Sequence, residues 1–439
     1  MIQFDEEMDE LSSTHFDDLP DAIVQCILGH MKNARDVAAC NCVSRRWKDS
    51  TAYVRSLFFP RNSFDNGTID PDIGVGRMIL STVWLEELII YCPFSTAGLA
   101  RWISAKSNSL RHLELRMDTL NEKRPPEEDP KLLEEIPNKL DCIGAAKGLE
   151  SLSLWGVLMC KTPKWGVFQK LRSLQIVGAR LNDSALCDTL RACPHVKKLS
   201  LLSCDGLRSI SIELPQLEEC RLDFYGQGDC MLSLSSSKVH LLDVQGCSWI
   251  RLEQNHRLRN LSVANNAGKV YKVDFGKLPA LEFLSIRGVQ WCWSAVSSIL
   301  QSASEVKHLV MKIEFSGDSN RLQPFPEIDL VEFFNNHPEM QTFEIQGAMF
   351  AAMCQRNSLK NLDPKFTIPC LEEVLITVRS PLNAEQKMST LDSILKYSTK
   401  LRKMVIRVSK MKNCHTSADD FFEEICRFGL MNRGIVQIE

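Results

Sequence analysis

A short pattern of apolar residues recurs along most of this chain, and it restricts the possible folds more than any other feature. Its clearest copy has Val196, Leu199 and Leu201, followed by Cys204 and Leu207. Leu199 and Leu201 are two residues apart, so on a strand both side chains point to one face. Cys204 follows where the chain turns away, and a small buried side chain fits inside such a bend. The pattern therefore predicts a short strand followed by a turn.

The first three apolar positions recur in copies on both sides of this one. These copies are Leu85/Leu88/Ile90, Leu110/Leu113/Leu115, Leu149/Leu152/Leu154, Leu171/Leu174/Ile176, Leu217/Cys220/Leu222, Val239/Leu242/Val244, Leu258/Leu261/Val263, Leu281/Leu284/Ile286, Val306/Leu309/Met311, Met340/Phe343/Ile345, Leu371/Val374/Ile376 and Leu401/Met404/Ile406. From Leu149 to Val306 they start 19 to 25 residues apart, close to the roughly 20–29 residues of a leucine-rich repeat. One unit cannot bury its own apolar face, so neighbours must stack on it. We expect an α/β leucine-rich-repeat solenoid, a horseshoe with parallel strands on the concave face.

The segments between copies predict the outer elements of the solenoid. Residues 182–193 have the pattern of a helix, with a cap at Asn182 or Asp183 and with Leu186, Leu190 and Cys193 facing inward. Shorter repeats leave no room for a helix, so we expect a turn or a short 3₁₀ segment there.

Beyond Met311 the spacing lengthens to between 30 and 34 residues, and helices over residues 329–336 and 383–397 fit the extra length. The second of these carries Met388, Leu391 and Leu395 on one face.

The N-terminal part reads as a small helical unit. An acidic lead over residues 1–15, expected to be disordered, precedes a helix that starts near Pro20 and that Asp18 can cap. Further helices fit residues 34–41 and 43–53, the last with Val43 and Trp47 on one face. Asn, Asp, Gly and Pro residues over 61–76 indicate a linker. So small a unit buries little surface and should dock on something else.

The same segment resembles an F-box. The residues that carry the resemblance are Leu19-Pro20, Ile23, Ile27-Leu28, Asp36-Val37 and the close Cys42-Val43-Ser44-Arg45-Arg46-Trp47. The resemblance implies binding to a Skp adaptor, with Leu19, Pro20, Ile23, Ile27 and Leu28 in the contact or just beneath it. Val43 and Trp47 would hold the helices together. The alternative is a plain N-terminal cap on the first repeat.

Residues 395–406 resemble the C-terminal region, of the FBD type, found in plant F-box proteins with leucine-rich repeats. The expected organisation is the lead at 1–15, an F-box at 16–59, a linker at 60–77, repeats at 78–370 and FBD-like C-terminal repeats at 371–439. The resemblance implies a substrate-recognition subunit of a Skp–cullin–F-box ubiquitin ligase, joined through the adaptor to a cullin and a RING subunit. Such a subunit catalyses no reaction and needs no cofactor.

Charge and composition exclude several other classes. The net charge of −3 over 439 residues gives no case for a nucleic-acid partner. No apolar run is long enough to cross a bilayer, and the acidic start is not a secretory signal. The 17 cysteines are therefore expected to be reduced thiols in the cytoplasm or the nucleus. Cys187, Cys193 and His195 match no zinc spacing, so no metal site is expected.

The residue after the third apolar position of each copy should lie on the exposed concave sheet. Aromatic and aliphatic side chains beside cations are typical of binding hot spots. We expect a protein target to cross the sheet here. Its predicted contacts are Trp155, Val177, Leu202, Arg287 and Lys312 in this column, and Phe283 from the neighbouring columns, which also contain Leu241 and Val310. For Trp155 the alternative is packing under the long loop 116–148.

Two other functions remain open. One is a repeat scaffold or inhibitor protein, which would have no use for the F-box residues. The other is a small-molecule receptor of the F-box class that holds an inositol polyphosphate on inward-facing basic residues. The candidates for that role are Arg221, Arg287, Lys312, Lys403 and Arg407, which are scattered over distant repeats.

Overall fold

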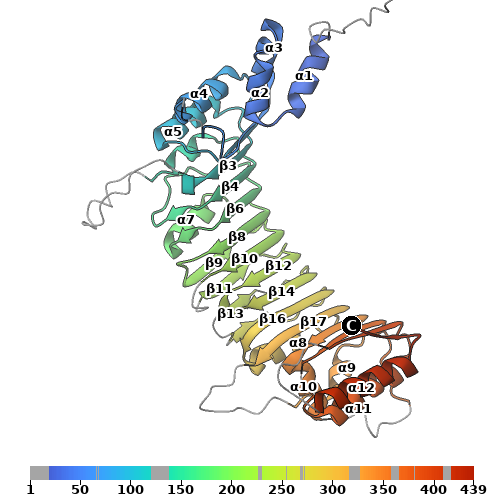
Figure 1. The fold of residues 1–439 in the computed structure, drawn as a ribbon. Coiled ribbons are helices and arrows are strands. Elements are labelled where there is room, and N and C mark those ends of the chain that lie inside the picture. The colour runs from blue at the N-terminus through green and yellow to red at the C-terminus, as the bar shows by residue number, and fades with distance from the viewer. Residues whose placement is uncertain are drawn as a thin grey trace, which may run out of the picture. The chain divides into compact units, whose positions relative to one another are not determined.

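The computed structural model describes residues 19–65, 67, 69–119, 138–225, 230–253, 255–266, 270, 272–315, 327–356, 365–379, 381–408 and 417–439. The acidic lead, Asp18 and most of the loop 116–148 lie outside this range. The chain, coloured by residue number in Figure 1, forms two compact units. Unit 1 is residues 1–155 with 163–170, and unit 2 is residues 156–162 with 171–439.

Unit 1 begins with three short helices, α1 (Asp21–His30), α2 (Ala34–Cys40) and α3 (Arg45–Ser50), followed by a 3₁₀ turn, η2 (Thr51–Tyr53). The side chain of Asn33 caps α2 and that of Ser44 caps α3, each by accepting a backbone N–H. Val24, Leu28 and Trp47 are almost fully buried. Since α1 packs against α3, these side chains form a small core for the helical unit.

The rest of unit 1 is a parallel sheet with outer helices. Its strands are β1 (Ser56–Phe59), β2 (Glu87–Ile90), β3 (His112–Arg116) and β4 (Ser151–Trp155), and they pair in that order. The outer elements are α4 (Pro71–Ser81), α5 (Thr96–Lys106), η3 (Met117–Thr119) and η4 (Asp141–Ala145).

One predicted boundary in unit 1 differs from the structure. Strand β1, at the end of the segment predicted as the F-box, pairs with β2 in the sheet. The predicted linker ends early, because α4 begins at Pro71. Asp70 caps this helix by accepting the N–H of Asp72 at 2.8 Å, and Val75 and Ile79 are buried beneath it. An Asp-Pro pair occurs at the start of helices as well as in loops. Here the buried apolar side of α4, with Val75 and Ile79, shows that the pair begins a helix.

The main sheet of unit 2 continues the repeat pattern. Its strands are β6 (Ser173–Val177), β8 (Lys198–Cys204), β10 (Glu219–Phe224), β12 (Leu241–Gln245), β14 (Asn260–Asn265), β16 (Phe283–Trp291), β17 (His308–Phe315), β18 (Thr342–Gln346), β19 (Glu373–Val378), β20 (Lys403–Val408) and β21 (Val436–Ile438). They pair in parallel in that order. The three apolar positions of every copy, in both units, are buried. This confirms the solenoid of leucine-rich-repeat type that the sequence predicts.

A second parallel sheet covers the middle repeats, where we expected turns or 3₁₀ segments. It is formed by β9 (Ser209–Glu213), β11 (Cys230–Ser235), β13 (Cys247–Leu252) and β15 (Lys272–Asp274), and the first three appear in Figure 1 as a separate row. Residues such as Ile210 and Ile212 alternate with polar ones, so one face of each outer strand is buried. The expectation of irregular outer segments was therefore wrong.

A glycine makes the turn between the two sheets possible. Gly246 has a φ of 86°, and a Cβ at that position would lie 2.3 Å from the carbonyl oxygen of Phe224. Only a residue without a side chain permits this close approach.

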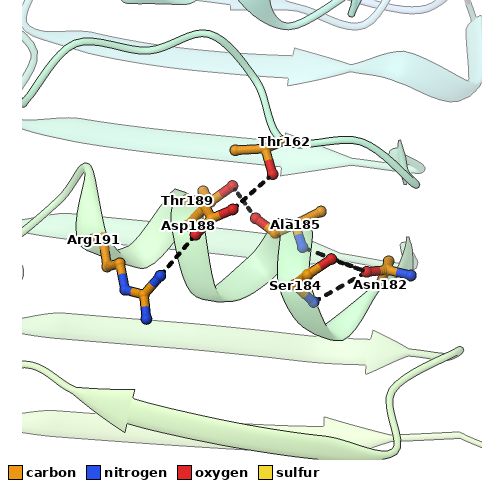
Figure 2. A network of polar contacts seen from close by, with 7 residues as sticks. All are labelled: Thr162, Asn182, Ser184, Ala185, Asp188, Thr189 and Arg191. Carbon is orange, nitrogen blue, oxygen red and sulfur yellow. Dashed lines mark hydrogen bonds and ion pairs between the residues drawn. The ribbon is translucent and has the colours of Figure 1, made fainter. Parts of the chain in front are cut away.

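The predicted helix at residues 182–193 is α7 (Asp183–Arg191), flanked by the two-residue strands β5 (Leu158–Met159) and β7 (Arg180–Leu181). Asn182 is its cap: the side-chain oxygen accepts the N–H of Ser184 at 3.0 Å and that of Ala185 at 3.5 Å (Figure 2). On the outer side Asp188 accepts hydrogen bonds from Thr162 at 3.1 Å and from Arg191 at 2.9 Å. Leu186, Leu190 and Cys193 are buried, as predicted.

The longer C-terminal repeats carry helices, as their spacing predicts. These helices are α8 (Trp293–Ser302), α9 (Leu330–Asn336), α10 (Gly347–Gln355), α11 (Ala384–Tyr397) and α12 (Ser417–Met431). Asp329 caps α9 through two backbone N–H groups. In α11 the predicted inner face is rotated: Leu391 and Ile394 are buried, whereas Met388 and Leu395 are only partly so. Three apolar positions on a short helix do not fix which side its neighbours cover.

Candidate functional site

Helix α1 is apolar on two sides. Val24 and Leu28 face the core, whereas Ile23 and Ile27, one turn apart, leave 46% and 37% of their surface exposed. The two residues therefore present a pair of aliphatic side chains on the surface of the helix. They are available to a partner.

The other predicted adaptor residues lie around α1. Pro20 is exposed at the start of the helix, and Leu19 beside it is partly buried. The carbonyl oxygen of Leu19 accepts a hydrogen bond from the guanidinium of Arg46, and Arg46 also pairs with Asp21 at 2.6 Å. Because Arg46 belongs to α3, these contacts tie the start of α1 to the third helix.

Trp47 is 4% exposed and holds the helices together, as predicted, but Val43 does not. Val43 is 50% exposed. The reason is the cap: Ser44 stands just before α3, so Val43 lies in the turn outside that helix. Val43 is thus part of the exposed apolar surface rather than of the core.

In unit 1 the open face of the sheet, opposite the packed apolar positions, carries an aromatic cluster around Glu114. The indole Nε1 of Trp155 donates to the Glu114 carboxylate at 3.0 Å, and the hydroxyl of Tyr91 donates to the same oxygen. The pKa of Tyr91 is raised to about 12. Burial is the largest cause, and the hydrogen bond to Glu114 is the next. Arg116 lies 6.0 Å over the Tyr91 ring and pairs with Asp118 at 3.0 Å. The indole N–H of Trp155 is therefore hydrogen-bonded within the sheet, while the residue stays partly exposed.

The remaining predicted target residues are in unit 2. Val177, Leu202, Phe283 and Lys312 are partly exposed on the open face, and Arg287 is exposed. A guanidinium nitrogen of Arg287 donates to the hydroxyl of Ser262 at 3.0 Å, which fixes the direction of this side chain.

A shallow hollow of about 320 Å³ opens on the same face across β10 to β16. Its lining includes Arg221, Leu241, Asp243, Asn260, Ser262 and Phe283. The sequence pattern singled out Leu241 and Phe283, because aliphatic and aromatic residues are unexpected at outward positions. It missed the polar members, Asp243 and Asn260, which look like ordinary solvated strand residues.

The basic residues considered for a polyphosphate do not form one cluster. Arg287 and Lys312 are register partners on adjacent strands, but Lys312 pairs with Glu344 at 2.6 Å. Arg407 pairs with Glu439 at 2.7 Å. With these two cations paired to carboxylates, the described part of the open face shows no concentration of positive charge of the kind that an inositol polyphosphate needs.

The described residues contain no group of three or more potential metal ligands, and no described helix is both long and apolar enough to cross a membrane. The repeat cysteines Cys204, Cys220 and Cys247 are buried as small core residues, as expected. Burial raises the pKa of the Cys220 thiol to about 12, so it stays protonated and unreactive at neutral pH.

Comparison with known proteins places this architecture in a family. The F-box-like family matches residues 16–58, which are the three helices and the start of β1. F-box protein At1g10780 from Arabidopsis thaliana is 59% identical over 425 residues, which cover 96% of this chain and all of the relative. Identity at this level extends through the repeats as well as the helical unit, and the chain therefore belongs to the F-box protein family.

Proposed function

We propose that this chain is the substrate-recognition subunit of a Skp–cullin–F-box ubiquitin ligase. Its F-box would bind a Skp adaptor, which links it to a cullin and a RING subunit, and its repeats would bind a protein target for ubiquitination. It would act in the cytoplasm or the nucleus without performing bond chemistry itself. The FBD-like assignment of residues 371–439 remains part of this proposal.

The observation that carries the proposal is the exposed apolar surface of the helical unit. Ile23, Ile27, Val43 and Pro20 are exposed while Trp47 and Leu28 fill the core. A plain cap on the first repeat would turn its apolar side chains toward the sheet. Here they face solvent, which suits a partner protein.

Removing this surface should abolish adaptor capture. We test two double variants, Ile23→Ser with Ile27→Ser and Leu19→Ala with Pro20→Ala. We expect neither to retain a purified Skp adaptor in a pull-down. Truncation of a central apolar anchor typically costs about 2 kcal/mol or more, so a double variant should lose several hundredfold in affinity, since about 1.4 kcal/mol is a factor of ten.

The matched control is Leu158→Ser with Leu382→Ser, which changes two side chains of unit 2 that are 68% and 74% exposed. Adaptor binding should survive this change. Full binding by both F-box double variants would remove the adaptor role and leave the scaffold or inhibitor function.

The target surface calls for a separate test. We expect Leu202→Ala, Phe283→Ala and Arg287→Ala each to weaken target capture by about 2 kcal/mol while adaptor capture stays unchanged. Trp155→Ala, in unit 1, tests the remaining predicted contact.

The measurement compares proteins labelled in proximity to each variant with the proteasome blocked, using the adaptor signal as the internal standard. If all four variants retain the same targets as the wild type, the target binds elsewhere.

A further inference from the structure

Charged residues follow the edge of the main sheet where its strands begin. The residue directly after the first apolar position of each copy lies on this rim. At several places on the rim a basic and an acidic residue form an ion pair between neighbouring repeats. The pairs are Arg55–Glu86 at 3.5 Å and Arg111–Glu150 at 2.7 Å in unit 1, and Lys197–Glu218 at 2.8 Å, Glu282–Lys307 at 3.6 Å and Glu372–Arg402 at 3.7 Å in unit 2.

Positive or protonatable residues are adjacent at two places on the rim of unit 2. At the first place, Arg172 is followed by Lys197, which is paired with Glu218. His240 and Arg259 occupy the rim position one strand apart, and the N–H of Arg259 donates to the carbonyl of His240 at 3.0 Å. Lys238 and Arg257, each two residues earlier in the chain, repeat the arrangement. At the second place, positive or protonatable groups thus stack at both positions in the two repeats.

The acidic residues on either side compensate this charge only in part. Glu218 bonds to Lys197 and Glu282 pairs with Lys307, so each is engaged with a lysine of the next repeat outward. The hydrogen bond from Lys197, then the positive charge of Lys197, His240 and Lys238, lower the pKa of Glu218. Neither Arg257 nor Arg259 forms an ion pair with a carboxylate in the described part of the chain.

These groups line a hollow of about 490 Å³. Its lining is Glu218, Lys238, His240, His256, Arg257 and Arg259, with Ala280 at one side. It therefore holds three permanent cations, two imidazoles and one carboxylate that is already paired.

Buried polar side chains hold the turns that carry the cations. Asn255 is 1% exposed, and its amide nitrogen donates to the carbonyls of Ser236 and Val239 at 3.1 and 2.9 Å. Its amide oxygen accepts the N–H of Arg257 at 2.7 Å. One repeat earlier, the hydroxyl of Ser236 donates to the carbonyl of Leu217 at 3.1 Å. The backbone around the hollow is therefore preorganised, and binding would order only the side chains.

We infer that this basic rim hollow binds an acidic segment of a partner protein through clustered carboxylate or phosphate groups. Strands one repeat apart are about 4.8 Å apart, so like charges stacked on them repel. An oxyanion between them removes this repulsion and accepts paired hydrogen bonds from an arginine. Alternate residues of an extended segment lie on one side at about 6.6 Å, so successive acidic groups reach successive cations.

A nucleic acid fits the hollow less well. Only three permanent cations line it, and it has no Trp, Tyr or Phe ring on which a base would stack. Binding at this hollow does not require the adaptor. It can therefore be tested independently of the proposed ligase role.

The test uses fluorescence anisotropy on the full chain with three labelled probes. These are a short alternating Ser-Glu peptide, its phosphoserine form and a short single-stranded poly-uridine. The variant is Arg257→Gln with Arg259→Gln. The control is Arg111→Gln with Arg402→Gln, which removes the same charge from two rim positions where each arginine is paired with a glutamate.

We expect the wild type to bind both peptides, the phosphorylated one more tightly, with affinity falling as salt rises. The Arg257/Arg259 variant should lose roughly tenfold or more, and the control should stay within about twofold. Peptide should raise the melting temperature of the wild type and control but not of the variant. Equal affinity of variant and wild type, equal loss in variant and control, or preference for poly-uridine would each overturn the inference.

Discussion

Leu199→Asp should unfold the repeats around β8 while distant repeats keep their structure. Leu199 is 1% exposed and is the register partner of Leu174 on β6 and of Cys220 on β10. A carboxylate there would be buried without a partner, at a cost of several kcal/mol. Because each repeat contacts mainly its neighbours, the loss should centre on residues 171–224 and fade with distance. Hydrogen exchange followed along the chain measures this gradient.

Ser200→Asp is the matched control, since Ser200 is the next residue of β8 and is only partly buried on the open face. It should leave protection close to that of the wild type. A uniform loss over the whole chain in Leu199→Asp, or no loss at all, would contradict the independence of the repeats.

Trp47→Ala should unfold the helical unit and with it abolish adaptor binding. The side chain is 4% exposed in a core that it shares with Val24 and Leu28. Replacing a buried Trp by Ala typically costs about 3–5 kcal/mol, and a three-helix unit has little stability to lose. Limited proteolysis should then cut within residues 21–53 while the repeats of unit 2 resist.

Val43→Ala is the control that the structure supplies, because Val43 is 50% exposed. This variant should stay resistant to protease, and any loss of adaptor affinity would come from the contact surface. If Trp47→Ala were as resistant as Val43→Ala, the helical unit would not depend on this core.

Local patterns in the sequence determined the repeats and the helix caps. The spacing of Leu199 and Leu201 sets two side chains on one face whatever the neighbours are, because the strand period is a property of the backbone. Asn182 and Asp329 cap their helices for the same local reason. The F-box residues were likewise recognisable, since their order and spacing lie within one short segment.

Only the tertiary structure decided which surfaces are covered. The sequence did not separate a turn from an outer strand at residues 209–213, because that strand exists only through pairing with β11. Val43 and Trp47 are four residues apart and were assigned to one face, but the Ser44 cap separates them.

The basic rim hollow also depends on the tertiary structure. The repeat pattern places His240 and Arg259 at the same position of adjacent copies, but it does not show which charged residues pair across strands. Stacking of successive repeats brings these two one strand apart, and it also pairs Glu218 with Lys197 and Glu282 with Lys307. Charge balance at a surface depends on neighbours across strands, which a pattern along one strand does not contain.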